Sequence, residues 1–118
     1  GVASSVQAEA VVEKIMAPNI FNTKIPFPTL DASHPDFNPE KGYWRGPVWM
    51  DQAYFALMGM KKYGYENEAL HLTSKIFSEI QYPALHENYH PITGAGLNSP
   101  HFSWTAAHLY LMVIEILN

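Results

Sequence analysis

The sequence predicts an all-α fold built from about four helices. Four segments carry apolar residues at helical spacing, and each is bounded by recognisable start or stop residues. No segment alternates apolar and polar residues over a convincing strand length, so any β-structure is limited to a small irregular hairpin within a loop. The 118-residue chain is 47% hydrophobic and 15% charged, which is typical of a globular unit with a hydrophobic core.

The first helix is expected at residues 5–16. Ser4 followed by Gln7 is the signature of a capping box, in which each residue satisfies a free backbone donor at the start of a helix. Pro18 ends the pattern because proline cannot continue a helix. One apolar face is supplied by Val11, Val12, Ile15 and Met16.

The second and third helices are expected at residues 50–63 and 66–80, joined by a short turn at Gly64. Lys61 and Lys62 lie in the last turn of the second helix, where positive charge interacts favourably with the helix dipole. Because the connection is short, the two helices are expected to form an antiparallel hairpin. Apolar residues recur at helical spacing in both, through Ala53, Tyr54, Leu57 and Met58, and through Ala69, Leu72, Thr73, Ile76 and Phe77.

Ser103 is expected to cap a fourth helix, which contains the longest apolar stretch of the chain, residues 104–117. These 14 residues are interrupted by His108 and Glu115, whereas a membrane span needs roughly 20 apolar residues. The segment is apolar on nearly every side, which suits a helix packed between other elements. Within this chain alone, such a helix would be left half exposed.

Two long connections, residues 17–49 and 81–102, are expected to form a binding face. Loops longer than roughly 12 to 15 residues are usually functional or disordered, and an aromatic-rich composition argues against disorder. The aromatic residues of these connections are Phe21, Phe27, Phe37, Tyr43, Trp44, Trp49, Tyr82, Tyr89 and Phe102.

Composition excludes several classes of partner. The net charge of −4 lacks the basic surplus that nucleic acid or an anionic membrane requires, so neither is an expected partner. The absence of cysteine excludes a disulfide framework and thiolate metal sites. It leaves the compartment open, with a periplasmic or secreted location favoured if the source is bacterial.

The first candidate site is the segment from Tyr43 to Trp49, with sequence YWRGPVW. Aromatic rings stack on the apolar face of a sugar, and the guanidinium of Arg45 supplies a fork of hydrogen-bond donors to hydroxyl or carboxylate oxygens. Gly46 and Pro47 set a turn that would bring the backbone close to a ligand. The aromatic residues could equally be core anchors beside a helix start, and composition alone does not separate these interpretations.

The second candidate site is the segment from His86 to His90, which matches the zinc motif H-E-x-x-H. That motif requires a helix, because only a helical turn brings both imidazoles to one metal. Pro83 precedes the motif and Pro91 follows it, which disfavours helical geometry and therefore zinc. Without zinc, Glu87 could orient a water molecule, or it could pair with Arg45 or a lysine for structural reasons.

The order of the motifs then favours one family. Residues 43–49, 63–65, 87–94 and 102–107 together resemble the C-terminal part of glycoside hydrolase family 63, and residues 1–3 and 25–29 also fit its layout. That family includes processing α-glucosidases. The resemblance implies an (α/α)6 barrel, with this chain, residues 1–118, as the C-terminal part of one catalytic domain that is incomplete alone. The active site would lie among the loops at one end of the barrel.

The resemblance also implies an inverting mechanism on α-linked, gluco-configured oligosaccharides, with Glu87 as the general base. Inversion needs two carboxyl groups roughly 6.5 to 9.5 Å apart, and the family's acid is an Asp N-terminal to this segment. Asp51 is instead explained by its place in the first turn of a helix, and Asp31 and Asp36 by turns. The expected substrate-binding residues are Tyr43, Trp44, Arg45, Gly46, Trp49, Asn88, Tyr89, His101 and Trp104.

Because the acid is missing, the N-terminal remainder of the enzyme, on the same or a second chain, is an expected partner. No cofactor or metal is expected in this segment. The alternative function is a non-catalytic carbohydrate-binding or scaffold segment that keeps the aromatic residues without a working acid–base pair.

Overall fold

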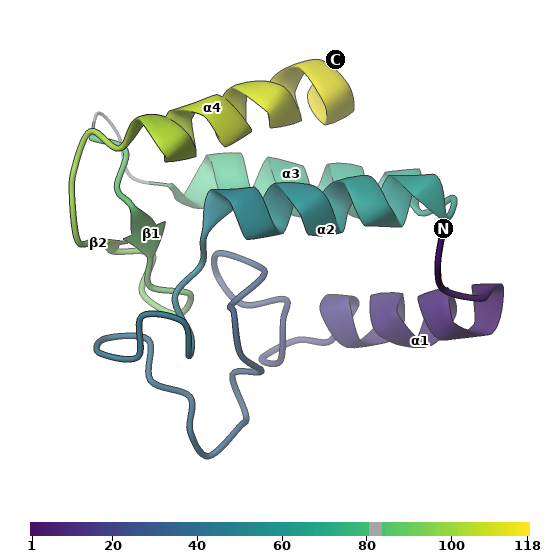
Figure 1. Ribbon diagram of the computed structural model, residues 1–118, viewed down its shortest axis with the longest axis horizontal. Helices are drawn as coiled ribbons and strands as arrows, with labels where there is room; N and C mark the ends of the chain where they lie inside the picture. Colours follow the sequence, from purple (N-terminus) through teal and green to yellow (C-terminus); the bar gives the residue numbers. More distant parts are fainter. Residues whose placement is uncertain (81–83) are drawn as a thin grey trace.

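The computed structural model describes residues 1–80 and 84–118, so Tyr82 and Pro83 lie outside the described residues. The elements in chain order are α1 (Ser5–Met16), α2 (Met50–Lys62), α3 (Glu66–Glu79), β1 (Asn88–Tyr89), β2 (Gly96–Leu97), α4 (Ser103–Met112) and a short π-helical segment, η1 (Val113–Leu117). Figure 1 shows the long loops and the two strands gathered at one end of the helices, opposite the α2–α3 turn. The predicted all-α class, with one small hairpin, is confirmed.

The capping box of α1 forms as the sequence predicts. The Ser4 hydroxyl accepts a hydrogen bond from the Gln7 backbone N–H at 3.3 Å, and the Gln7 side chain accepts one from the Ser4 N–H at 2.8 Å. Two donors that no helical carbonyl can reach are thereby satisfied. The helix ends at Met16, two residues before Pro18.

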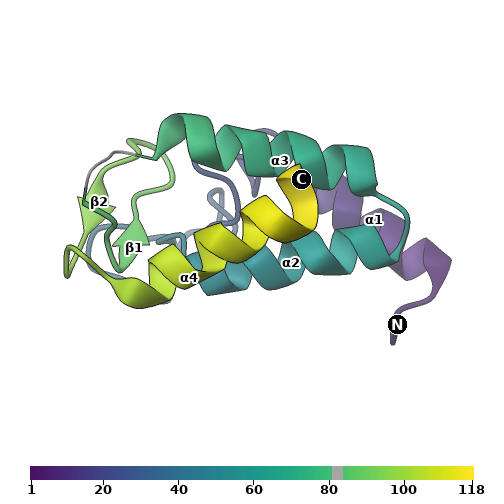
Figure 2. The same cartoon turned by 90° about the horizontal axis from the view of Figure 1, so that it is seen from above.

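Helices α2 and α3 form the predicted hairpin, and α4 lies across them, as Figure 2 shows. Gly64 makes the turn with a φ of +87°, a left-handed conformation that costs glycine little. The shared core combines residues of all four helices with residues of both long loops. Its buried members include Val12, Ile25, Val48, Leu57, Met60, Leu72, Ile76, Tyr89, Leu109 and Met112.

The start of α4 differs from the prediction by one residue. Phe102 is the N-cap and Ser103 is already helical, with no side-chain cap hydrogen bond. The Phe102 N–H donates to the Leu85 carbonyl at 2.8 Å, so a loop contact fixes where the helix begins. As expected, α4 and η1 are half exposed: Leu109 and Met112 are buried, whereas Tyr110 and Ile114 face outward. Among the described residues, no helix is long and apolar enough to cross a membrane.

The loop between α1 and α2 folds back against the second long loop. Ile25 donates its N–H to the Pro91 carbonyl at 3.1 Å, and Val48 forms a two-hydrogen-bond bridge with Tyr89. Gly46 is buried, with a φ of +149°, and a Cβ there would lie 2.9 Å from the Pro39 backbone. The two loops therefore form one packed layer at the ends of α2 and α4.

Replacing Gly46 by alanine is expected to destabilise the fold by about 2 kcal/mol, because the added Cβ meets backbone and the φ is unfavourable for alanine. The matched control is Gly59→Ala in α2, where a Cβ meets nothing within 4 Å. That change should stabilise the helix by about 0.5 to 1 kcal/mol. Urea unfolding measures both, and equal stability of the two variants would contradict the packing described for Gly46.

Candidate functional site

Glu87 lies immediately before β1, where the backbone is held from both sides. Its N–H donates to the Ser99 carbonyl at 2.9 Å. The Thr105 hydroxyl, in the first turn of α4, donates to the carbonyls of His86 and Glu87 at 2.7 and 3.4 Å. The pairing of β1 with β2 continues this support, with Asn88 opposite Leu97. The main chain of Glu87 is therefore fixed from two sides, by the segment that contains β2 and Ser99 and by the first turn of α4.

The Glu87 carboxylate accepts a short hydrogen bond at Oε1 from the hydroxyl of Tyr43. This hydrogen bond raises the pKa of the Tyr43 phenol, with smaller contributions from desolvation and from the Glu87 charge. Among the described residues, no ion pair links Glu87 to Arg45 or to a lysine. The structural alternative considered for Glu87, a salt bridge, is thus not what the structure shows.

The aromatic residues of the first candidate site divide into supporting and exposed rings. Trp49 is only 2% exposed, and its indole N–H donates to the Tyr43 carbonyl at 3.0 Å. Trp44 stacks on Trp49 with ring centroids 4.2 Å apart and planes within 7° of parallel. Trp44 and Trp104 are 49% and 46% exposed, so their rings remain available to a ligand. The core-anchor interpretation therefore describes Trp49, whereas for Trp44 and Trp104 the sugar contact stays a prediction.

Glu87 shares a small depression with Asp51. The depression is lined by Trp49, Met50, Asp51, Glu87, Phe102, Trp104 and Thr105. Asp51 is 7% exposed, lies in the first turn of α2 as predicted, and accepts a hydrogen bond from the Gln52 side chain at 2.8 Å. The sequence explained this carboxylate by the helix dipole alone, whereas the structure also places it beside Glu87.

Three predicted substrate-binding residues offer no surface to a ligand here. Asn88 and Tyr89 are fully buried, and Gly46 is packed against Pro39. The Asn88 side-chain carbonyl accepts from the Asn98 side chain at 2.8 Å, and the Tyr89 hydroxyl accepts from the His86 N–H at 3.0 Å. In this structure Asn88 and Tyr89 build the loop that carries Glu87 and Gly46 belongs to the loop packed against it, so the sugar contact expected of these three residues stays a prediction.

Arg45 and His101 are both exposed, but they occupy different places. The Arg45 backbone is hydrogen-bonded to Gly42 and Asn38, and the residue is exposed. His101 has a φ of +55° and lines a separate shallow pocket with Leu85, Phe102 and Ser103. The structure therefore does not bring His101 into the depression that holds Glu87.

The H-E-x-x-H segment has no helical turn, so the zinc geometry is contradicted. The strand β1 interrupts the segment, and the His90 ring accepts hydrogen bonds from the N–H groups of Ile92 and Thr93 at 3.2 Å. Within residues 1–80 and 84–118, no cluster of three or more His, Asp or Glu side chains could hold a metal ion. Asp31, as predicted, closes a turn by accepting hydrogen bonds from Ser33, which lowers its pKa.

Comparison with known sequences identifies relatives of this chain. The family model of the mannosylglycerate hydrolase MGH1-like glycoside hydrolase domain matches residues 1–105. The mannosylglycerate hydrolase of Rubrobacter radiotolerans is 35% identical over 112 residues, which cover 92% of this chain and 25% of that relative. The mannosyl-oligosaccharide glucosidase of Saccharomyces cerevisiae is 27% identical over 97% of this chain and 15% of its own length.

Solved structures agree with the sequence matches. A mannosylglycerate hydrolase of Thermus thermophilus, a member of glycoside hydrolase family 63 solved in complex with glucose, superposes with a TM-score of 0.81 at 26% identity. The match covers 94% of this chain and 28% of that enzyme. The same enzyme with Tris and D-glycerate gives a TM-score of 0.81 at 27% identity, over 92% of this chain and 26% of that one.

This chain thus spans less than a third of the length of these relatives. Its helices correspond to a segment of their (α/α)6 barrel, as the motif order predicted. The match to the family model over residues 1–105, together with these relatives and structures, shows that the chain belongs to the MGH1-like domain family within glycoside hydrolase family 63.

Proposed function

We propose that this chain, residues 1–118, is the C-terminal part of one (α/α)6 catalytic domain of an inverting glycoside hydrolase and supplies its general base, Glu87. The observation that carries the proposal is the setting of that carboxylate. Glu87 is half-buried on a backbone held by Ser99 and Thr105, accepts a hydrogen bond from the Tyr43 hydroxyl at Oε1, and lies in one depression with Trp104. A rigidly held carboxylate between sugar-stacking rings can orient and deprotonate a water molecule.

The proposed step uses one oxygen of the Glu87 carboxylate, Oε2. Tyr43 occupies Oε1, and Oε2 has no hydrogen-bond partner among the described residues. Oε2 would accept a proton from a water molecule, whose oxygen forms the new bond to the anomeric carbon while the glycosidic bond breaks. The leaving oxygen needs a proton from a carboxylic acid roughly 6.5 to 9.5 Å away. We assign that acid to the remainder of the domain.

Glu87→Gln in the complete enzyme is expected to lower kcat by roughly 10³-fold or more, because the amide cannot take the proton. The fold should be kept, since the backbone contacts of Glu87 do not involve its carboxylate. Steady-state kinetics and a thermal melt measure the two effects. The matched control, Glu66→Gln at the start of α3, changes an exposed carboxylate at the far end of the helices and should leave turnover intact.

Full turnover by the Glu87→Gln enzyme would remove Glu87 from the mechanism. In that case the second candidate, a non-catalytic carbohydrate-binding segment, would gain support from the exposed rings of Trp44 and Trp104.

The proposed substrate is an α-linked, gluco-configured oligosaccharide. A second candidate is mannosylglycerate, the substrate that names several relatives. Arg45, which is exposed and follows Trp44 in the sequence, favours this candidate, because its guanidinium could pair with the glycerate carboxylate.

Proton NMR of fresh digests should distinguish the two substrates and test inversion together. Inversion predicts that the β-anomer appears first from an α-linked substrate, before mutarotation mixes the forms. An α-anomer as first product would contradict Glu87 as the base of an inverting pair. Faster turnover of mannosylglycerate than of neutral α-glucosides, lost in Arg45→Gln, would select the second candidate.

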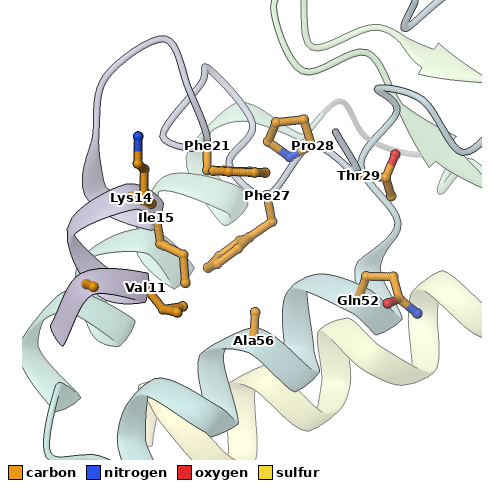
Figure 3. Close-up of a pocket in the computed structure, with 10 residues that line it drawn as sticks. Val11, Lys14, Ile15, Phe21, Phe27, Pro28, Thr29, Gln52 and Ala56 are labelled. Carbon is orange, nitrogen blue, oxygen red and sulfur yellow. The ribbon is translucent and has the colours of Figure 1, made fainter. Parts of the chain in front are cut away.

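An apolar cleft beside α1 supports the proposed association with the rest of the domain. The cleft has a volume of about 590 Å³ and separates α1 from α2. Figure 3 shows Val11 and Ile15 of α1 facing Ala56 of α2, with the ring of Phe27 between them. A second cleft of about 250 Å³ continues along the same three residues, Val11, Ile15 and Ala56. We propose that helices from the remainder cover this surface and the outer face of α4.

Val11→Asp is expected to weaken association when the chain is co-expressed with the remainder of the domain. Val11 is 56% exposed in this chain, so the change should not unfold it, but it would bury a charge in the assembled domain. The matched control is Val6→Asp on the same helix, at a residue that is 75% exposed and outside both clefts. The weakened association is measured by how much of the remainder co-purifies with this chain. A stable monodisperse monomer that never associates with the remainder would contradict the proposal.

A further inference from the structure

We infer that Tyr43 is a positioning residue for the Glu87 carboxylate, a role that rests on the proposed function and differs from the sugar contact expected from the sequence. Glutamate has three side-chain torsions, and the last of them is broad, so backbone contacts alone do not fix the plane of its carboxylate. A general base must be held within about 0.5 Å and 10 to 20° of its productive geometry. Among the described residues, the hydrogen bond from Tyr43 is the contact that restrains this carboxylate.

Trp49 contacts both the backbone carbonyl and the ring of Tyr43. The Trp49 indole donates to the Tyr43 carbonyl at 3.0 Å, and its ring packs edge-on against the Tyr43 ring with centroids 4.9 Å apart. Trp44 makes a second edge-on contact with centroids 5.9 Å apart. Because Trp49 is buried at the start of α2, these contacts connect the phenol to the helical core.

The backbone of Tyr43 is strained in a way that fits this role. Its φ of +48° is left-handed, which is uncommon for a non-glycine residue and costs of order 1 to 3 kcal/mol. The tight turn at Gly42, where the N–H groups of Trp44 and Arg45 both donate to the Gly42 carbonyl, holds this conformation. Such strain persists where the surrounding structure directs a side chain to a particular place, and the side chain of Tyr43 ends on Glu87.

The phenol keeps its proton in this arrangement. The hydrogen bond to Glu87 raises the pKa of Tyr43 above its ordinary value, so the hydroxyl stays neutral to higher pH and remains the donor to Oε1. Tyr43 therefore holds Oε1, and Oε2 remains available to a water molecule.

Tyr43→Phe in the complete enzyme tests this role, because phenylalanine keeps the ring packing and removes only the hydroxyl. We expect kcat to fall by roughly 10²-fold, the size of effect that a misplaced catalytic group produces. KM should change less than about threefold, since the aromatic face remains. The matched control is Tyr63→Phe, which removes a hydroxyl bonded to the backbone of Ala3 at the far end of the helices and should leave kcat and KM unchanged.

A second measurement does not depend on turnover. With ¹³C-labelled tyrosine, NMR titration should show the Tyr43 pKa falling towards its ordinary value in Glu87→Gln, because the carboxylate that raises it is gone. Identical titration of Tyr43 in both proteins would overturn the role of Tyr43, even if Tyr43→Phe failed to fold.

The kinetic outcomes distinguish failure of the positioning role of Tyr43 from failure of the proposed function of Glu87. An inactive Glu87→Gln together with a Tyr43→Phe enzyme of normal kcat overturns the positioning role alone. A rise in KM with unchanged kcat in Tyr43→Phe does the same, because it makes Tyr43 a substrate contact. An active Glu87→Gln enzyme instead overturns the proposed function on which the role rests.

Discussion

Two backbone hydrogen bonds between Val48 and Tyr89, at 2.8 and 3.0 Å, join the two long loops of this chain. One loop carries Tyr43 and Trp49 into the start of α2, and the other carries Glu87 into β1. Neither loop contains a long stretch of paired strands, so this bridge, the Ile25–Pro91 hydrogen bond and the buried Tyr89 ring fix the relative position of the loops. The contact between Tyr43 and Glu87, 44 residues apart in sequence, depends on that register.

The same constraint explains why conspicuous motif residues have unequal roles. The bridge between the two loops lies in a packed layer that leaves Asn88, Tyr89 and Gly46 buried. Residues at the margin of this packed layer keep their side chains exposed, as Trp44, Arg45 and Trp104 do. The motif therefore contains both the support and the surface that a ligand would meet.

The surface of the chain indicates how the site would be completed. Helix α1 is tied at one end by the Tyr63–Ala3 hydrogen bonds and at the other by the following loop, with an apolar cleft between it and α2. The outer face of α4 and η1 is also apolar and exposed. Both surfaces suit packing against further helices. They match the proposal that this chain supplies one carboxylate of an acid–base pair and a larger domain supplies the other.

Local signals in the sequence determined the helices and most of their limits. Ser4 and Gln7, the Lys61–Lys62 end of α2, and Gly64 act over one turn of chain, so spacing alone predicted them. Pro91 likewise excluded the zinc helix because it restricts its neighbour directly. Motif order was sufficient to predict the family and to select Glu87 as the candidate base.

Tertiary structure alone decided which of the motif residues are exposed and which are buried. Burial of Asn88 and Tyr89, the start of α4 at Phe102, and the separation of His101 from Glu87 all arise from contacts between segments distant in sequence. The hydrogen bond from Tyr43 to Glu87 is of the same kind. Residue types and spacing describe only what a chain can do locally, whereas these features depend on which loop packs against which.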